Sequence, residues 1–287
     1  MTGSMRKKVT LRQLRQMKNE RQRIVGLGVY DSPMASIADE IGFELFVIGN
    51  SGPMSLLGYD DSAHVQSTDL FYMTRAVSRV TRYALIIATM PYMSYLISSE
   101  EGIRTAARFV SEGGADCVQC HGNRHSADNI AAIVNAGIPV LAHLGLQSTR
   151  KVAQSGFSVQ GRTAEAAARI VEDAECLVAA GVFAIIAELV PAELTGYLRT
   201  HLPVPVLSLG SGADADGIYQ VSADVVGFSV FPRPKNAAQF VDARTVAAQG
   251  MQRYFECVRS KIYPTEDDRR SMPESELRRF QDKVVRN

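Results

Sequence analysis

Residues 164–188 read AEAAARIVEDAECLVAAGVFAIIAE, and this stretch contains one unit of a pattern that the chain repeats. Its first part, 164–180, spaces apolar residues as an amphipathic helix does, and Gly181 is a residue at which such helices end. The run that follows, 182–187, is apolar throughout and is closed by the charged Glu188. The stretch therefore predicts a helix followed by a strand that is buried on both faces.

The same order of elements recurs along the chain. Eight short apolar or β-branched runs are typical of strands, at 24–30, 44–49, 84–90, 115–121, 138–143, 182–188, 204–210 and 223–229. Amphipathic segments lie between several of them, at 70–82, 100–112, 164–180 and 192–201. Eight buried strands joined by helices predict an α/β fold, a (β/α)₈ TIM barrel with extra N- and C-terminal helices. A doubly wound open sheet is the alternative.

No linker rich in proline, glycine or serine divides the chain. We expect an N-terminal helical segment at residues 1–23, the barrel at 24–235, and C-terminal helices at 236–287. The last segment is charged and is interrupted by Pro264 and Pro273. We expect it to pack on the barrel or on a neighbouring subunit.

Composition excludes several classes of protein. The 287 residues carry a net charge of +1, are 46% hydrophobic and 21% charged, and include no tryptophan. A chain of this kind is globular rather than disordered, and without a basic block it is not expected to bind nucleic acid. The longest uncharged runs are interrupted by proline or glycine, so we expect no membrane span. Four cysteines and a charged N-terminal segment without a signal-like core predict a cytoplasmic protein.

Polar residues close nearly every predicted strand. In a (β/α)₈ barrel, active sites lie at the C-terminal ends of the strands, so these residues would face one another there. They are Tyr30, Asp31, Asn50, Ser51, Thr89, Gln119, His121, His143, Glu188 and Ser211. A barrel with only a structural role would not need this many polar strand ends. The sequence therefore predicts an enzyme.

Three of these residues have side chains suited to proton transfer. Glu188 follows an apolar run, and a carboxylate held away from water can act as a general base or acid. The alternative is a glutamate that pairs with an arginine or caps the next helix. His121 and His143 fit a proton shuttle, a metal ligand or a hydrogen-bond donor to a substrate carboxylate, or a purely structural role.

Two further motifs are weaker. The string Cys117-Val-Gln-Cys120-His121 matches covalent haem attachment, but strand alternation places Cys117, Gln119 and His121 on one face and Cys120 on the other. A two-cysteine zinc site fails for the same reason, so no metal site is predicted. Residues 210–212, Gly-Ser-Gly, fit either an anion cradle made by backbone N–H groups or a plain tight turn.

Taken together, these strand ends resemble the ketopantoate hydroxymethyltransferase family, from about residue 14 to about residue 254. The motifs that carry the resemblance are Tyr30-Asp31, 58–60 (GYD), 90–95 (MPYMSY), 114–116 (GAD), 143–146 (HLGL), 159–163 (VQGRT), 188–194 (ELVPAEL), 210–212 (GSG) and Asp216-Gly217. The resemblance implies a barrel of the phosphoenolpyruvate mutase and isocitrate lyase type, which in this family is usually a decamer. It also implies transfer of a hydroxymethyl group from 5,10-methylenetetrahydrofolate to 3-methyl-2-oxobutanoate, with Mg²⁺ chelated by the keto acid.

The chain departs from the family at residues that carry the chemistry. The resemblance implies metal-ligating aspartates at the positions of Asn50 and Thr89, and a lysine and a glutamate at Gln119 and His121. Glu188 and Ser51 match the family's catalytic base and a substrate contact, whereas 147–149 (QST) replaces a Thr-Pro-Gln. Because Mg²⁺ is usually held by carboxylates, the neutral replacements predict a weak Mg²⁺ site or none.

Three functions follow as hypotheses. The first is a divergent enzyme that makes or breaks a C–C bond next to the carbonyl of an α-keto or related carboxylic acid. Glu188 would be its base, and Asn50, Ser51, Thr89, Gln119, His121, His143 and Ser211 would hold the substrate. A protonated His121 and the neutral donors would stabilise the enolate without Mg²⁺. The second is the ordinary folate-dependent hydroxymethyltransferase of pantothenate biosynthesis, and the third is a non-catalytic paralogue that binds a small acid. We expect a homo-oligomer in each case.

Overall fold

Eight parallel strands form the centre of the protein. The computed structural model describes residues 6–154, 156–235 and 237–284. The strands are β1 (Ile24–Gly28), β2 (Leu45–Ile48), β3 (Leu85–Thr89), β4 (Cys117–His121), β5 (Val140–Gly145), β6 (Ala184–Glu188), β7 (Val206–Leu209) and β8 (Gly217–Val221). They pair in chain order, and β8 pairs with β1 to close the sheet. The predicted barrel is confirmed, and this closure excludes the open sheet.

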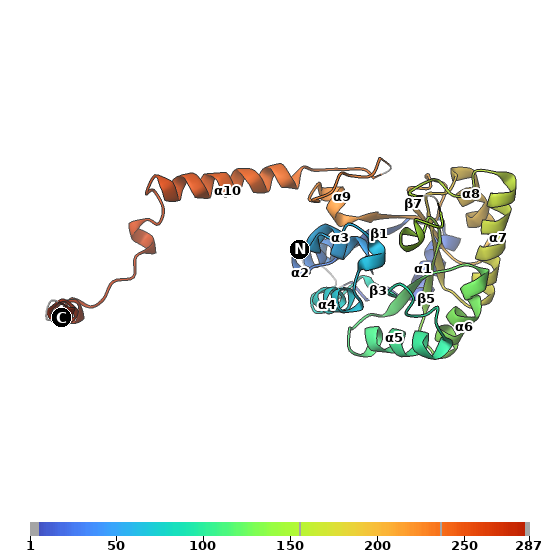
Figure 1. Ribbon diagram of the computed structural model, residues 1–287, viewed down its shortest axis with the longest axis horizontal. Helices are drawn as coiled ribbons and strands as arrows, with labels where there is room; N and C mark the ends of the chain where they lie inside the picture. The colour runs from blue at the N-terminus through green and yellow to red at the C-terminus, as the bar shows by residue number, and fades with distance from the viewer. Residues whose placement is uncertain (1–5, 155, 236, 285–287) are drawn as a thin grey trace. The chain divides into compact units, whose positions relative to one another are not determined.

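Helices surround the strands (Figure 1). They are α1 (Leu11–Asn19) before the barrel, then α2 (Ser32–Ile41), α3 (Ser51–Leu57), α4 (Ser67–Ser78), α5 (Ser99–Ser111), α6 (Ala127–Asn135), α7 (Ala164–Ala179), α8 (Ala192–His201) and α9 (Ser222–Val226). Short 3₁₀ turns, η1 (Ser62–His64), η2 (Arg124–Ser126) and η3 (Ser148–Arg150), lie in the loops that follow β2, β4 and β5. The four amphipathic segments predicted from the sequence correspond to α4, α5, α7 and α8.

The eighth strand lies earlier in the chain than the sequence predicts. The apolar run 223–229 was expected to be this strand, but most of it belongs to the short helix α9, which ends at the left-handed Gly227. The observed strand, β8, begins at Gly217, where an added Cβ would lie 2.6 Å from Leu207 of β7. Because β8 lies this close to its neighbours at its first residue, that residue is a glycine. The strand therefore does not begin as an apolar run.

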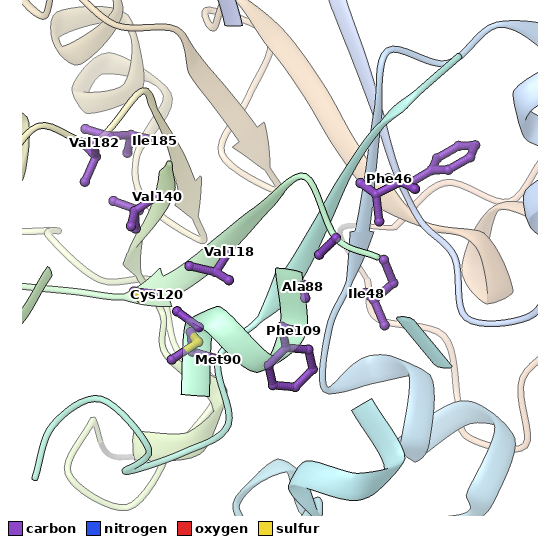
Figure 2. Close-up of a cluster of buried hydrophobic side chains, with 14 of the residues drawn as sticks. Phe46, Ile48, Ala88, Met90, Phe109, Val118, Cys120, Val140, Val182 and Ile185 are labelled. Atoms are coloured by element: carbon purple, nitrogen blue, oxygen red, sulfur yellow. The ribbon is translucent and has the colours of Figure 1, made fainter. Parts of the chain in front are cut away.

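The core has two layers, one on each side of the barrel wall. Inside the barrel, Leu45, Ile87, Leu141 and Ile186 belong to one buried cluster. Outside it, alternate residues of the same strands pack against the helices, and Figure 2 shows this outer layer around Phe109, Val118 and Cys120. Cys117 lies in the inner layer, so the predicted alternation of Cys117 and Cys120 is confirmed.

The chain divides into two compact units, 1–241 and 242–287. The second contains α10 (Ala243–Arg259), η4 (Glu266–Asp268) and α11 (Glu274–Val284). Between 242 and 284 no residue is buried, and α10 exposes the apolar side chains of Met251, Tyr254 and Phe255. The packing of this unit on the barrel or on a neighbour stays a prediction. In the part of the chain that the structure describes, no helix is long and apolar enough to cross a membrane.

Candidate active site

The inner layer changes from apolar to polar at the C-terminal end of the barrel. Side chains alternate along a strand, so Glu188 lies on the same face as Ile186, two residues before it. On each of the three preceding strands, an apolar inward-facing residue is likewise followed two positions later by a polar one. The inward-facing polar residues, which we call the mouth cluster, are Thr89 of β3, Gln119 and His121 of β4, His143 of β5 and Glu188 of β6.

Four members of the mouth cluster form a continuous chain of hydrogen bonds, here called the relay. The Thr89 hydroxyl donates to Oε1 of Gln119 over 2.7 Å. Nε2 of Gln119 lies 2.6 Å from Nδ1 of His143, and Nε2 of His143 lies 2.6 Å from Oε2 of Glu188. Thr89, Gln119 and His143 are buried, and the Glu188 side chain is 20% exposed. The relay crosses four consecutive strands and ends at the one member open to solvent.

The direction of the relay fixes the proton of His143. Because Oε1 of Gln119 accepts from Thr89, its amide NH₂ faces His143, and an amide nitrogen can only donate. Nδ1 of His143 therefore accepts, and the imidazole proton lies on Nε2, where it is donated to Glu188. Glu188 thus pairs with a histidine rather than with an arginine, and among the described residues it does not cap α8, the next helix.

Glu188 keeps one carboxylate oxygen free. Oε2 is bound by His143, whereas Oε1 forms no hydrogen bond with any residue that the structure describes. The next residue, Leu189, has φ of 45°, a left-handed conformation that costs a non-glycine residue on the order of 1–2 kcal/mol. The backbone is therefore strained directly after the candidate base, which is common at functional sites.

His121 lies beside the relay without joining it. Its ring centre is 4.5 Å from that of His143, and its imidazole nitrogens form no hydrogen bond with the described residues. Burial, followed by the neighbouring His143 and Arg150, lowers the pKa of His121 well below its usual value. The direction of this shift argues against the protonated His121 expected from the sequence. A neutral imidazole can still donate one hydrogen bond.

Asn50 and Ser51 follow β2 and extend the site on the other side of Thr89. Asn50 is 8% exposed, and its side-chain amide forms no hydrogen bond with a described residue. The Ser51 hydroxyl lies 2.5 Å from the Tyr30 hydroxyl. Burial raises the pKa of Tyr30 and of Tyr219, and the Glu188 carboxylate adds to the shift of Tyr219. Both phenols therefore remain protonated and can donate.

Two glycines on this side of the barrel let side-chain hydroxyl groups lie close to the backbone. A Cβ added at Gly28 would lie 2.8 Å from the Tyr219 hydroxyl, and one added at Gly49 would lie 3.4 Å from Oγ1 of Thr89. The positions where β1 and β2 meet the mouth cluster therefore carry no side chain. A group placed there would meet the hydroxyl groups of Tyr30, Thr89 and Tyr219.

Two of the predicted polar ends form local backbone contacts. The Ser211 hydroxyl is buried, donates to the carbonyl of Ala187 and accepts from the N–H of Val190. A substrate contact by Ser211 would have to replace one of these bonds. Asp31 caps α2 by accepting from the N–H of Met34 over 2.8 Å.

The residues around the relay fit Mg²⁺ poorly. Asn50, Thr89, Gln119 and His121 supply neutral amide, hydroxyl and imidazole groups, and the Thr89 hydroxyl already donates to Gln119. Mg²⁺ is normally held by one or more carboxylates in octahedral geometry. Among the described residues, no group of three or more His, Cys, Asp or Glu is placed to hold a metal ion.

Sequence reasoning missed two residues of this site. Tyr219 lies on β8, but the eighth strand was predicted at residues 223–229. The sequence therefore did not show that Tyr219 faces the inside of the barrel. Arg150 lies in η3, far enough beyond β5 that no strand-end rule identifies it. It lines a cavity together with Gly122 and Gly145, which adjoin the mouth cluster, and its charge contributes to the pKa shifts of His121 and Tyr95.

Comparison with known proteins gives one consistent family. Residues 8–266 match the model of the family described as ketopantoate hydroxymethyltransferase. The chain is 37% identical to the 3-methyl-2-oxobutanoate hydroxymethyltransferase of Dehalococcoides mccartyi strain BAV1, over 90% of this chain and 92% of the relative. It is also 37% identical to the enzyme of that name from Thermoanaerobacter sp. strain X514, over 92% and 96% of the two chains.

Solved structures share the fold at low sequence identity. A phosphonopyruvate hydrolase matches with a TM-score of 0.58 and 14% identity, covering 97% of each chain. A 2,3-dimethylmalate lyase, described as a member of the PEP mutase/isocitrate lyase superfamily, matches with a TM-score of 0.55 and 16% identity, covering 96% of each chain. At this identity the likeness to these two structures shows a shared fold and nothing further.

Proposed function

Because the chain belongs to the ketopantoate hydroxymethyltransferase family, we propose that it makes or breaks a C–C bond next to the carbonyl of an α-keto acid or a related carboxylic acid. The reaction passes through an enolate, with Glu188 as the base. The family match and the 37% identity to named hydroxymethyltransferases support carbon–carbon chemistry on a small acid. The relay supports the choice of Glu188.

The state of Glu188 is the observation that carries the proposal. His143 holds Oε2 through its Nε2 proton, so the carboxylate is oriented while Oε1 stays free. Oε1 takes the proton from the carbon next to the carbonyl, and the enolate carbon then adds to the carbonyl carbon of a second reactant, whose oxygen receives the proton from Glu188. In the cleavage direction Glu188 takes the proton of the hydroxyl group on the β-carbon, the C–C bond breaks to give an aldehyde and the enolate, and protonated Glu188 returns that proton to the enolate carbon.

The substrate oxygens are held by neutral donors. Asn50, Ser51 and His121 have donor groups that other described residues do not fully engage, and we assign them to the carboxylate and to the developing enolate oxygen. Thr89 and Gln119 act through His143 by setting its tautomer. Enolate stabilisation by fixed hydrogen-bond donors replaces stabilisation by Mg²⁺ in this scheme.

The ordinary family reaction is the second candidate. Its support is that the relatives at 37% identity are named for hydroxymethyl transfer to 3-methyl-2-oxobutanoate. In this reading 5,10-methylenetetrahydrofolate is the co-substrate and a metal ion is required. Asn50→Asp combined with Thr89→Asp should then raise Mg²⁺-dependent turnover, and a variant without that gain contradicts this candidate.

Proton exchange followed by NMR tests the first step. The protein is placed in D₂O with 3-methyl-2-oxobutanoate and other α-keto acids, with and without Mg²⁺, Mn²⁺ or Zn²⁺. We expect exchange without added metal, and a fall of roughly 10²–10⁴-fold in Glu188→Gln, because a general base contributes about that factor. Glu193→Gln, an exposed glutamate on α8, is the matched control and should exchange at the parent rate.

Each other result selects a different function. Exchange that requires added metal supports the ordinary reaction. Exchange that persists in Glu188→Gln removes Glu188 as the base. Absence of exchange with every acid refutes enolate chemistry on these substrates and favours a paralogue that only binds a small acid.

A further inference from the structure

A cavity of about 580 Å³ lies beside the active site but outside the barrel. Gly122 and Gly145, at the ends of β4 and β5, form one wall, and Arg169 and Asp173 of α7 form the opposite wall. Leu144, which also lines it, belongs to the outer packing layer, whereas the adjacent His143 faces inward. The volume lies in the range typical of small-molecule sites.

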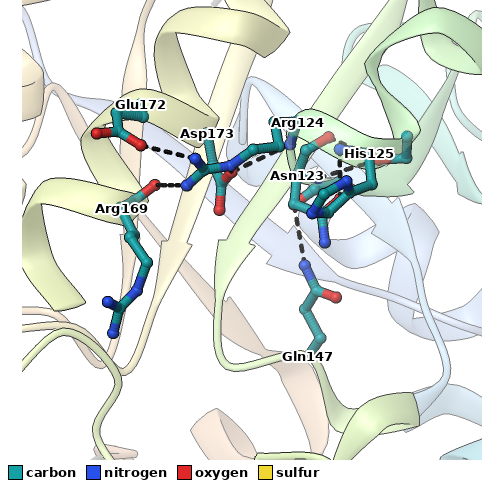
Figure 3. A network of polar contacts seen from close by, with 9 residues as sticks. Asn123, Arg124, His125, Gln147, Arg169, Glu172 and Asp173 are labelled. Atoms are coloured by element: carbon teal, nitrogen blue, oxygen red, sulfur yellow. Dashed lines mark hydrogen bonds and ion pairs between the residues drawn. The ribbon is translucent and has the colours of Figure 1, made fainter.

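Three arginines line this cavity, which we call the arginine pocket. The charge of Arg124 is compensated, because its Nη1 lies 2.7 Å from Glu172 and its Nε lies 2.8 Å from Asp173. Figure 3 shows these contacts and shows the Arg169 side chain pointing away from both carboxylates. Arg150 and Arg169 form no ion pair with any residue in the described ranges. Their two charges outweigh the single net negative charge of the Arg124 group.

The segment that carries Arg150 is held in place by two side-chain amides, those of Gln147 and Gln154. Gln147, which is 5% exposed, donates from Nε2 to the carbonyl of Gly122 over 3.0 Å. Gln154 accepts from the N–H of Gln147 and donates to the carbonyl of Gly145, over 2.8 and 2.9 Å. These hydrogen bonds connect both ends of segment 147–154 to the residues at the ends of β4 and β5. The position of Arg150 is therefore largely preformed, which reduces the entropy lost on binding.

Arg150 also connects the pocket to the mouth cluster. It lines the pocket, and its charge acts on His121, whose ring lies against that of His143. Gly122 of the pocket directly follows His121, and Gly145 of the pocket is paired with Glu188 in the sheet. An anionic group held by Arg150 therefore lies close to the mouth cluster.

We propose that the arginine pocket binds an anionic group, a carboxylate or a phosphate, through Arg150 and Arg169. The substrate is then a keto acid with a second anionic group, and the mouth cluster holds its keto-acid end. This inference about substrate class rests on the proposed function, but the pocket itself can be tested without turnover. Charge-assisted hydrogen bonds from guanidinium groups suit both anions.

Two measurements test the proposal. Calorimetry with inorganic phosphate and with succinate measures binding directly. Proton exchange compares 2-oxoglutarate, which has a second carboxylate, with 2-oxobutanoate, which lacks it. We expect KM to be at least about tenfold lower for 2-oxoglutarate, and this difference to disappear in Arg150→Gln and in Arg169→Gln. Arg150→Lys should restore part of it, and Arg162→Gln, an exposed arginine of the same loop, should leave it unchanged.

The outcomes separate the pocket from the proposed function. Equal KM values for the two acids, without binding of phosphate or succinate, overturn the pocket proposal even where exchange is observed. Binding that depends on Arg150 and Arg169, without exchange of any acid, supports the pocket and counts against the proposed reaction. Tighter binding of phosphate assigns a phosphorylated substrate, and tighter binding of succinate assigns a dicarboxylate.

Discussion

Gln119 should be more costly to replace than an ordinary buried glutamine, because it satisfies two other buried groups at once. Gln119→Met keeps the length of the side chain and removes both amide hydrogen bonds. The Thr89 hydroxyl and Nδ1 of His143 then lose their partners, and both residues are at most 4% exposed. An unpaired buried polar group costs about 1–3 kcal/mol, so we expect the free energy of unfolding to fall by about 2–4 kcal/mol.

A double-mutant cycle isolates the relay from general packing. Thr89→Val alone leaves Oε1 of Gln119 unpaired and should cost about 1–2 kcal/mol. Combined with Gln119→Met, it removes the hydroxyl that would otherwise lack a partner. The double variant should therefore lose less than the sum of the single losses, by about 1 kcal/mol. Thr74→Val, a buried threonine on α4 that bonds Leu70, is the control and should add to Gln119→Met within about 0.5 kcal/mol.

Urea unfolding followed by circular dichroism gives the four free energies, and ¹⁵N NMR reports the tautomer of His143. We expect the Nε2–H form in the parent protein and a mixture of tautomers in Gln119→Met, because Nδ1 no longer faces a donor. Strict additivity of Thr89→Val and Gln119→Met would refute the relay as a coupled unit. An Nδ1–H tautomer in the parent protein would refute the direction assigned to it.

Three further predictions concern other parts of the molecule. The pKa of His121 is lower in the folded protein than its usual 6.5, so the unfolded chain binds more protons and stability falls as the pH drops below about 6.5. Between pH 7 and 5.5, the free energy of unfolding in urea should fall less steeply for His121→Gln than for the parent protein. The two slopes should differ by at most about 1.4 kcal/mol per pH unit, and equal slopes would contradict the lowered pKa of His121. Gly28→Ala places a methyl group against the hydroxyls of Tyr30 and Tyr219 and should destabilise by about 1–3 kcal/mol, whereas Gly250→Ala on α10, with open space around it, should not lower the melting temperature. Ending the chain after Val241 removes the exposed apolar side chains of α10, and light scattering should show a smaller assembly with the barrel's circular dichroism retained; an unchanged mass would argue against this segment as a subunit contact.

The barrel could be predicted from the sequence because its strands are buried on both faces. Such strands are continuous apolar runs, as in 182–187, and a polar residue at the end of a run is easy to recognise. Glu188 was placed correctly at the end of β6 by this rule, whereas β5 continues two residues beyond His143, to Gly145. The rule failed at β8, because Ile218 and Gln220 are only partly buried and the strand begins at a glycine. An apolar helix, α9, was more strand-like in composition than the strand itself.

The relay could not be predicted because it depends on contacts between strands. The register pairs Thr89 with Gln119, but it pairs Gln119 with Leu141 and His121 with His143. Gln119 reaches Nδ1 of His143 diagonally, so pairing by register alone would have assigned His121 as the partner. The sequence gives the residue types on each strand, whereas their hydrogen-bond partners depend on side-chain direction across the barrel.

This geometry changes the meaning of a neutral residue at position 119. The family resemblance implies a lysine there, so a glutamine at this position means one positive charge fewer. In the structure the same side chain supplies a donor to His143 and an acceptor for Thr89, which a lysine could not do because its ammonium group has no acceptor. Gln119 therefore orients His143, which holds Glu188, and a positive charge that forms no ion pair with a described residue is available at Arg150 in the arginine pocket. If both assignments hold, Arg150→Gln changes which acids bind, and Gln119→Met changes how fast a bound acid exchanges its proton.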